Sequence, residues 1–343
     1  MDIRNYFKEQ FPMPGLLGVE KLAAVYIGFT LLLTALYYGD METSALVSVV
    51  GGRIAIVAVT FLLYLLYQRR PCHATYQLRV VFQVALLAYW YPDIYNFSSM
   101  LPNQDHLLAN VEQTIFGCQP ALVFSQVLSG AFWKELFCFG YFSYFAMIAI
   151  IVLIVMTRRP RRFDSVTFVL MCTFFLYYVV FLLFNSAGPQ FYFTAPGVDA
   201  ANGVFPFVDD WFRTHSELPA SYSGPFSYLV YLLHGSETPI AAFPSSHVGV
   251  STVIMIMLYR LKARWALLML PFYVLLCLST VYIGAHYAID VVAGWVSAII
   301  FMAIARKLYK SKFFHRPEGF DNLHRFGHHH KHHHHRHHRH HKH

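Results

Sequence analysis

Two segments of the sequence combine residue types that can transfer a phosphoryl group. In the first, Pro244, Ser245 and Ser246 precede His247 and a run of mostly apolar residues. Proline suits the first position of a helix, and serine is a preferred N-cap residue. The first turn of a helix offers unpaired N–H groups and the positive end of the helix dipole, so we predict an anion site with Ser245 and Ser246 as phosphate contacts. His247 projects from the same turn, where it can give a proton to a leaving oxygen.

The second segment begins at His286 and places Asp290 four residues later. That spacing puts both side chains on one face of a helix. A carboxylate in this position fixes the tautomer of the imidazole and stabilises its positive form, which leaves the other ring nitrogen as a nucleophile. An aspartate within an apolar run is costly and usually indicates function.

Each of these residues has an ordinary explanation when it is taken singly. A lone histidine at a helix end is more often an interfacial or hydrogen-bonded residue, and an aspartate near a helix start also complements the helix dipole. Together, His247, His286 and Asp290 supply all the parts of a histidine-based phosphoryl transfer. We predict these three as the catalytic residues, with no metal ion and no cofactor, because the imidazoles and helix N-termini provide the electrostatic stabilisation.

The elements that must position these residues are membrane helices. Hydrophobic residues make up 57% of the chain and charged residues 13%, whereas soluble domains have about 45–50% and about 25%. A bilayer-spanning helix needs about 20 mostly apolar residues. We predict an all-α integral membrane protein with about eight transmembrane helices, at roughly 21–39, 46–68, 78–99, 137–157, 163–185, 246–261, 265–284 and 286–306.

Every alternate loop between these segments is basic, and this pattern predicts the orientation of the chain. Basic loops stay in the cytoplasm, so both termini are expected there and the active site at the outer (periplasmic or lumenal) face. Such a multi-pass protein is expected in a cytoplasmic (inner) membrane or a Golgi-type endomembrane. The expected layout is a cytoplasmic N-terminus (1–20), a membrane catalytic domain (21–312) with outer loops 100–136 and 186–245, and a basic His-rich cytoplasmic tail (313–343).

The net charge of +8 does not indicate nucleic-acid binding, because the basic residues sit mostly in short clusters between the apolar runs and at the end of the chain. Twelve of the last sixteen residues are histidine. Two interpretations of this tail stay open: a solvated basic segment, and a segment that binds metal ions.

The two motifs together resemble a known family. Pro244-Ser245-Ser246-His247 followed by His286-x-x-x-Asp290 is similar to the type 2 phosphatidic acid phosphatase superfamily. The resemblance covers about 160–306 well and the earlier helices more loosely. It implies a six-helix core in which the second histidine is the nucleophile, the aspartate orients it and the first histidine is the acid.

One departure separates the chain from the phosphatase branch of that family. Phosphatases typically carry an arginine six residues before the second histidine, plus an upstream lysine and an Arg-Pro pair. Here Thr280 takes the place of that arginine, and the segment from Asn185 to Gln190 contains no lysine or arginine. A dianionic monoester would therefore lack its usual cationic partners, whereas a phosphodiester carries a single negative charge.

The segment 279–290 resembles instead the inositol phosphorylceramide synthases of the fungal type, and 286–291 is similar to the sphingomyelin synthases. The segment 185–189 looks like an upstream motif of the same synthases, and 105–120 looks like their outer segment. This resemblance implies substrate contacts from Asn185, Gln190, Tyr282 and Tyr287.

Arg53 is a further predicted substrate contact. It lies about eight residues into the second predicted helix, roughly 10 Å deep at about 1.5 Å per residue. Two interpretations stay open: the side chain extends to the interface, or it pairs with a phosphate or carboxylate inside the bundle.

The sequence therefore predicts a lipid phosphotransferase with membrane lipids as its partners. It would move a phospho-headgroup, phosphoinositol by resemblance, from a glycerophospholipid to a ceramide-like acceptor. The alternative is a lipid phosphate phosphatase that acts on phosphatidic acid or a related monoester. A transporter or channel would instead carry polar residues near the bilayer midplane or broken helices, and a binding protein with a dead site conflicts with the intact His247, His286 and Asp290.

Overall fold

The computed structural model describes residues 6–208, 211–215, 222–234 and 239–314. Within these residues the regular structure is helical, apart from one isolated antiparallel bridge between Asp199 and Val204. The prediction of an all-α protein is confirmed. The His-rich tail, with the metal binding considered for it, lies outside the described residues, apart from its first two residues.

Six of the described helices are long and apolar enough to cross a membrane, so the chain is a membrane-embedded protein. They are α2 (Gly18–Leu36), α3 (Thr43–Arg69), α9 (Ala131–Thr157), α10 (Phe163–Leu183), α15 (Ala263–Tyr282) and α16 (Ala288–Tyr309). The 3₁₀ turn η1 (Pro160–Arg162) leads into α10. Helix α9 begins six residues before the predicted start at 137, and its first turns carry Lys134 and Glu135.

The other two predicted segments are helical but do not form long apolar helices. Helix α14 (Ser246–Leu261) has 16 residues, whereas a helix that crosses a bilayer needs about 20. The segment predicted at 78–99 is divided into α4 (His73–Ala85), α5 (Leu87–Asp93) and α6 (Tyr95–Ser98). Pro92 lies inside α5, and a proline has no N–H to continue the helical hydrogen bonds.

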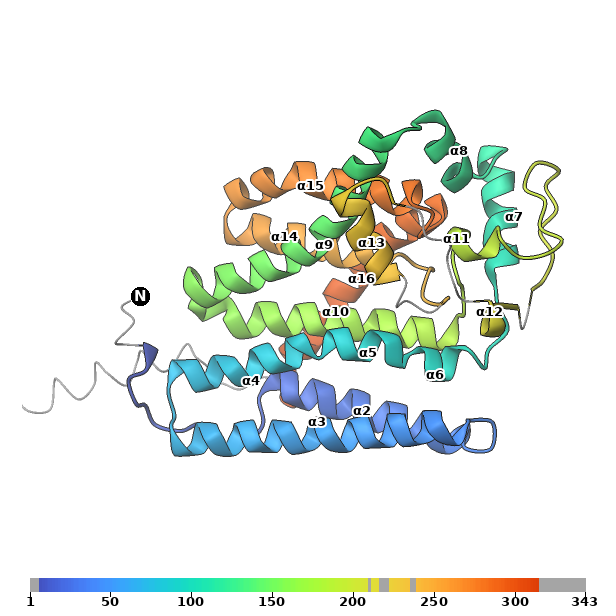
Figure 1. The fold of residues 1–343 in the computed structure, drawn as a ribbon. Coiled ribbons are helices and arrows are strands. Elements are labelled where there is room, and N and C mark those ends of the chain that lie inside the picture. The colour runs from blue at the N-terminus through green and yellow to red at the C-terminus, as the bar shows by residue number, and fades with distance from the viewer. Residues whose placement is uncertain (1–5, 209–210, 216–221, 235–238, 315–343) are drawn as a thin grey trace, which may run out of the picture.

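Helix α10 is the centre of the bundle. The buried share of its span is 78%, against 17% for α3, which therefore faces lipid. Helix α10 packs against α2, α4, α9, α14 and α16. Helices α9, α14 and α15 lie on one side of α10, and α2, α3 and α4 lie on the other (Figure 1).

Two buried ion pairs join the N-terminal helices to the rest of the bundle. Arg53 on α3 donates to both oxygens of Asp93 on α5, at 2.7 and 2.5 Å. Arg79 on α4 donates to both oxygens of Glu20 on α2, at 2.8 and 2.6 Å. Arg53 is buried and does not extend to the interface; its partner inside the bundle is a carboxylate.

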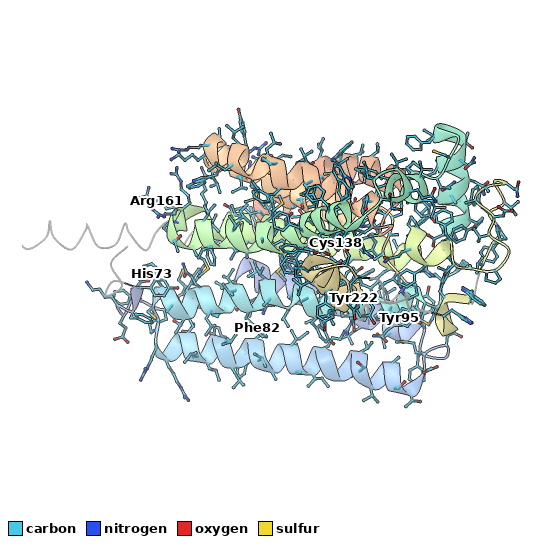
Figure 2. All side chains as sticks on the ribbon, turned by 45° about the horizontal axis from the view of Figure 1, so that its top comes forward. His73, Phe82, Tyr95, Cys138, Arg161 and Tyr222 are labelled. Carbon is cyan, nitrogen blue, oxygen red and sulfur yellow. The ribbon has the colours of Figure 1, made fainter. Side chains whose placement is uncertain are left out.

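The two ends of the bundle differ in character. His73 and Arg161 lie at one end (Figure 2). Short helices gather at the other end: α7 (Asp105–Phe116), α8 (Pro120–Val127), α11 (Pro189–Tyr192) and α12 (Trp211–Thr214) (Figure 1). Helix α13 (Pro225–His234) packs against α9. Helix α8 lies within the predicted outer loop 100–136 and ends at Val127.

Candidate active site

His247 lies in the first turn of α14, where the local sequence stops the preceding loop and starts the helix. The Ser245 side chain caps the helix by accepting a hydrogen bond from the Val248 N–H at 3.3 Å. This is the N-cap that the sequence predicts. Ser246 is buried next to His247, which is 8% exposed.

His286 lies in the turn between α15 and α16, and its ring is held through Nδ1. That atom lies 2.7 Å from the carbonyl oxygen of Ala242 and 3.6 Å from Oδ2 of Asp290. A carbonyl oxygen only accepts, so Nδ1 carries the hydrogen and Nε2 of the neutral ring has the lone pair. The Asp290 oxygen is itself fixed by the Tyr287 N–H at 2.8 Å.

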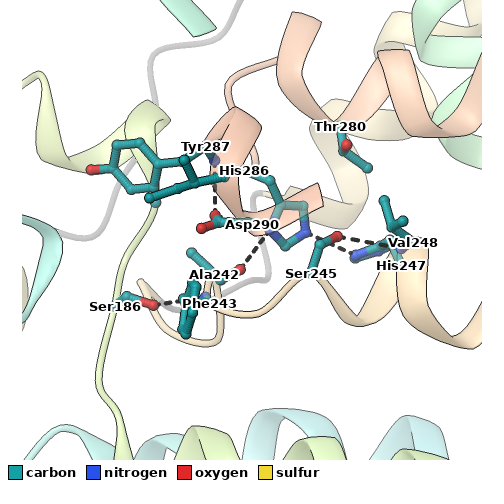
Figure 3. A network of polar contacts seen from close by, with 12 residues as sticks. Ser186, Ala242, Phe243, Ser245, His247, Val248, Thr280, His286, Tyr287 and Asp290 are labelled. Carbon is teal, nitrogen blue, oxygen red and sulfur yellow. Dashed lines mark hydrogen bonds and ion pairs between the residues drawn. The ribbon is translucent and has the colours of Figure 1, made fainter. Parts of the chain in front are cut away.

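The two histidines face one another across the site. Nε2 of His286 lies 3.2 Å from Nδ1 of His247 (Figure 3). Because Nε2 of His286 is the acceptor, His247 donates its Nδ1–H in this contact. A phosphorus atom bound to Nε2 would have to enter between the two rings, so this contact must open when substrate binds.

Burial keeps His286 neutral. Removal from water lowers the pKa of His286 to about 4, and the hydrogen bond to Ala242 offsets part of this shift. A neutral imidazole has the lone pair that a nucleophile requires. Asp290 is fully buried, and its Oδ1 atom has no hydrogen-bond partner among the described residues. Buried polar atoms without a hydrogen bond are rare in folded proteins, and a catalytic role is one explanation for such an atom.

Helices α14 and α16 meet at their starts, which places the two motifs at the same level. The Ser245 N–H donates to the Asp290 carbonyl oxygen at 3.1 Å. A Cβ atom on Gly294 of α16 would lie 2.8 Å from the Ser245 carbonyl oxygen. Only glycine permits this approach, so Gly294 sets the distance between the two halves of the site.

A buried carboxylate on α7 organises the loop that follows α10. Asp105 accepts hydrogen bonds from the N–H groups of Ala187 and Gly188 at 2.5 and 2.8 Å, and from the Tyr287 hydroxyl at 3.0 Å. Burial raises the pKa of Asp105, while these hydrogen bonds act in the opposite direction. Asp105 therefore ties α7 to both the loop and the start of α16.

The same loop reaches the carbonyl group that holds His286. Ser186 accepts a hydrogen bond from the Ala242 N–H through its carbonyl oxygen at 3.1 Å, and from the Phe243 N–H through its hydroxyl at 2.9 Å. Gly188 has a φ of +91°, and a Cβ atom there would lie 2.7 Å from the Ala285 carbonyl oxygen. The loop thus packs directly on the turn that carries His286.

Glu112 is a second carboxylate that sequence reasoning missed. Its Oε1 atom accepts the Ile289 N–H in the first turn of α16 at 3.1 Å. Burial raises the pKa of Glu112 to about 7, and the nearby Asp290 adds to the shift. Asp105 and Glu112 are seven residues apart, which places them on one face of α7. That spacing was the available signal.

The predicted substrate contacts near the site are distributed as follows. The Tyr287 hydroxyl is engaged with Asp105, as described above. The Tyr282 hydroxyl donates to the Leu128 carbonyl oxygen at 2.8 Å. The Asn185 amide donates to the Leu101 carbonyl oxygen at 2.9 Å, and the Gln190 N–H donates to the Gly284 carbonyl oxygen at 2.8 Å.

Arg53 is not brought to the two histidines. It lies on α3, on the far side of α10 from α14 and α15 (Figure 1), where Asp93 accepts its hydrogen bonds. Its side chain also packs over the rings of Trp90 and Phe97.

An apolar cavity of about 790 Å³ ends at His247. Its walls come from α4, α5, α9 and α10, and Ser246 and His247 are among its polar lining residues. Along α9 the lining extends from Tyr144 to Met156, roughly 18 Å at about 1.5 Å per residue. The described residues that line it include no lysine or arginine.

Two tyrosines from α9 pack on the ring of His247. The ring centroids of Tyr141 and Tyr144 lie 4.7 and 4.5 Å from that of His247. These two rings fix the imidazole of His247 at the end of the apolar cavity.

No group of three or more His, Cys, Asp or Glu side chains in the described residues is arranged to hold a metal ion. The site instead consists of a neutral histidine, a second histidine with a proton to give and a carboxylate, at the end of an apolar cavity. Together with the helical bundle, this arrangement is chemically suited to phosphoryl transfer at a membrane.

The comparison with protein families agrees with this chemistry. Residues 106–304, more than half of the chain, match the model of the PAP2 superfamily. The chain belongs to the PAP2 superfamily, and its activity is of the lipid phosphatase or phosphotransferase type. Neither the curated proteins nor the solved structures give a significant match.

Proposed function

We propose that the protein is a lipid phosphotransferase that moves a phospho-headgroup, phosphoinositol in the first instance, from a glycerophospholipid to a ceramide-like alcohol. The observation that carries the proposal is the 3.2 Å contact between His286 Nε2 and His247 Nδ1 at the end of an apolar cavity. One nitrogen is prepared to attack and the other to donate a proton.

In the first half-reaction, Nε2 of His286 attacks the phosphorus of the donor diester. The bond from phosphorus to the diacylglycerol oxygen breaks, and protonated His247 gives its proton to that oxygen. The phosphorylated imidazole becomes positively charged. Its Nδ1–H then points to the Ala242 carbonyl oxygen and to Asp290, which stabilise the charge.

In the second half-reaction, the hydroxyl oxygen of the acceptor lipid attacks the phosphorus. Neutral His247 takes the hydroxyl proton, the bond from phosphorus to Nε2 breaks, and His286 returns to its neutral form. The residues regenerate themselves, so the donor headgroup ends on the acceptor and no proton is gained or lost.

The charge around the site favours a diester as donor. A phosphomonoester carries about −1.5 to −2 charges near neutral pH, and burying such a charge without cationic partners is expensive. Thr280 and the loop 185–190 offer none, and the described lining of the apolar cavity contains no lysine or arginine. A single negative charge fits this weaker field.

The arrangement of charges also supports an orientation in the membrane. His73 and the arginines near Arg161 lie at the end of the bundle opposite α7 and α11 (Figures 1 and 2). If basic loops face the cytoplasm, the active site opens at the outer face of an inner or Golgi-type membrane and both termini lie inside.

The test is a reconstitution. Purified protein is given phosphatidylinositol labelled in its headgroup, with and without ceramide, and phosphatidic acid in the same detergent. We expect labelled headgroup on ceramide and slow release of phosphate from phosphatidic acid. Rapid hydrolysis of phosphatidic acid, with no headgroup transfer to any added alcohol, would show that the protein is a phosphatase and not a transferase.

A further inference from the structure

The apolar cavity that ends at His247 runs along α9 for about the length of one membrane leaflet. Tyr144, whose ring packs on His247, lines one end, and Met156 lines the other end, roughly 18 Å away at about 1.5 Å per residue. The hydrocarbon core of a bilayer is about 30 Å thick, so each leaflet contributes about 15 Å. The cavity is therefore long enough to hold one extended hydrocarbon chain of a lipid whose polar end lies at His247.

Two aromatic side chains of α10 close the inner side of the cavity. Phe174 and Tyr178 line it and are buried. The Tyr178 hydroxyl donates to the Leu87 carbonyl oxygen at 2.9 Å, which ties α10 to α5. This bond satisfies the hydroxyl group, so an apolar chain in the cavity would leave no unpaired polar group on Tyr178.

Small side chains line the outer side of the cavity. Ala85 at the end of α4, Ala88 on α5 and Ala149 on α9 belong to the lining and are also exposed. An exposed side chain on a membrane helix faces lipid, so the cavity opens sideways into the bilayer between α9 and the pair α4 and α5. A lipid chain can therefore enter from the bilayer without passing through water.

The wall formed by α4 and α5 lies outside the part of the chain that matches the family. The match begins at residue 106, whereas these two helices end at Asp93. Lining residues lie on both sides of the break between them: Ala85, Leu87, Ala88 and Pro92. The break that divides the predicted helix 78–99 is thus part of the wall of the cavity.

We propose that the apolar cavity binds a hydrocarbon chain of the lipid alcohol, and that the departing diacylglycerol and the incoming ceramide-like acceptor occupy it in turn. The proposal rests on the proposed function, in which His247 protonates the oxygen of the first alcohol and deprotonates the hydroxyl of the second. Both oxygens must then lie at the same imidazole, and the cavity ends there.

The cavity contributes position more than affinity. Lipid tails are as apolar as leucine side chains, so a chain gains little when it moves from the bilayer into the cavity. A chain held there keeps the alcohol oxygen next to His247, and groups held in the right geometry react far faster than groups that meet at random. Filling the cavity should therefore slow the reaction of long-chain lipids and spare lipids with chains too short to use it.

Substitutions of the lining alanines test this role. Ala149→Phe and Ala88→Phe place a ring in the cavity from opposite walls. In reconstituted full-length protein, we expect kcat/KM for long-chain phosphatidylinositol to fall at least about 10-fold in both variants, and kcat/KM for dibutanoyl phosphatidylinositol to stay near wild type. Ala146→Phe is the matched control, because Ala146 is exposed on the same helix and is not a lining residue; it should change neither value. Equal losses for the two donors in both lining variants, or no loss in either, would overturn the proposal.

Photolabelling tests the shared occupancy without turnover. Diacylglycerol and ceramide that carry a diazirine at the end of one chain are added separately to vesicles containing the protein, and the labelled peptides are located by mass spectrometry. We expect both lipids to label α9 near Met156, and each label to be displaced by an excess of the other lipid and reduced in Ala149→Phe. Label on α3, which faces lipid, should not be displaced. Labelling near Met156 by one lipid only, or without mutual displacement, would overturn the proposal.

Failure of the cavity assignment and failure of the transfer reaction can be told apart. If the two lipids displace one another near Met156 but no headgroup moves to any alcohol, the cavity assignment stands and the transferase function does not. If headgroup transfer proceeds and both lining variants leave it unchanged, the transferase function stands and the cavity assignment does not.

Discussion

Nδ1 of His286 is held by the backbone of Ala242 more closely than by Asp290. The carbonyl oxygen of Ala242 lies at 2.7 Å and the carboxylate oxygen at 3.6 Å, which is beyond hydrogen-bonding distance. In this state the backbone fixes the tautomer, and Asp290 is placed to stabilise the positive charge that develops on the ring.

This division of roles predicts the effect of Asp290→Asn. Where an aspartate alone sets the tautomer of a catalytic histidine, the Asn variant loses about 10⁴-fold in kcat. Here the Ala242 carbonyl oxygen retains the tautomer, so we expect a smaller loss in kcat, of order 10²-fold, with KM little changed. Steady-state transfer assays on both proteins provide the measurement.

His286→Asn is the matched control for Asp290→Asn, because it removes the nucleophile itself. It should show no turnover above background, and no label from the donor headgroup should become attached to the protein. A loss as large in Asp290→Asn as in His286→Asn would mean that the carboxylate, and not Ala242, holds the ring.

Asp105→Asn is predicted to disturb the site without touching substrate. The carboxylate of Asp105 accepts from Ala187, Gly188 and Tyr287, and an amide oxygen has to replace two oxygens while its NH₂ group faces donors. Breaking a buried network of this kind costs about 1–3 kcal/mol. We expect a lower Tm and a lower kcat, both measured in the same detergent.

Ser44→Ala, on exposed polar surface at the start of α3, is the control for Asp105→Asn and should change neither quantity. A normal Tm and kcat for Asp105→Asn would show that Asp105 does not hold the loop and the start of α16 in place.

Titration of Glu112 is predicted to make the protein less stable as the pH rises. Its pKa is about 7 in the folded protein against about 4.5 for an ordinary glutamate, so the folded state holds the extra proton between these values. The contribution of Glu112 to stability is therefore present at low pH and is lost as the pH rises from about 4.5 to about 7. His286, with its pKa lowered to about 4, acts in the opposite direction, so wild type alone does not isolate the effect.

Comparison with Glu112→Gln isolates it, because the glutamine cannot titrate. Relative to wild type, the variant should gain about 1–2 kcal/mol in unfolding free energy between pH 5 and pH 8. Thermal unfolding of both proteins at several pH values measures this difference. A difference that stays constant with pH would show that Glu112 does not titrate in this range.

The sequence predicts well what depends on local pattern. Apolar segments of the right length predict helices, and the spacing from His286 to Asp290 places both side chains on one face. The start of α14 at Ser245 and Ser246 also follows from local capping chemistry. These features need no knowledge of contacts between distant segments.

What the sequence does not predict depends on such contacts. Asp105 and Tyr287 are 182 residues apart, and nothing in either segment indicates that they meet. The partner of Arg53 was equally hidden, since Asp93 lies 40 residues away in a segment expected to be one unbroken helix. The Ala242 carbonyl oxygen is a backbone group, which no pattern of side chains reveals.

The orientation of the bundle gives a prediction for labelling in cells. In a background without reactive native cysteines, Ser223→Cys next to α13 should react with a membrane-impermeant thiol reagent in intact cells, because the site end of the bundle is expected outside. Lys262→Cys, between α14 and α15, should react only after the membrane is permeabilised. The reverse pattern would invert the topology and move the site to the cytoplasmic face.

Variants of the ion pair between Arg53 and Asp93 can distinguish a structural role of Arg53 from a role in substrate binding. Removing one partner of a buried pair costs about 3–5 kcal/mol, whereas an apolar replacement of both partners is often neutral. Arg53→Met should therefore lower the Tm strongly, and the double variant Arg53→Met, Asp93→Leu should recover most of the loss.

The same double variant tests whether Arg53 contacts substrate. Arg53 pairs with Asp93 on the far side of α10 from α14, and mutations at distant sites with no shared partners act independently, so the double variant should keep kcat/KM within about 3-fold of wild type. Thermal unfolding and transfer assays on the same preparations measure both quantities. A double variant that is stable but inactive would show that Arg53 contacts the substrate. If the role of Arg53 were only structural, activity would return once stability is restored.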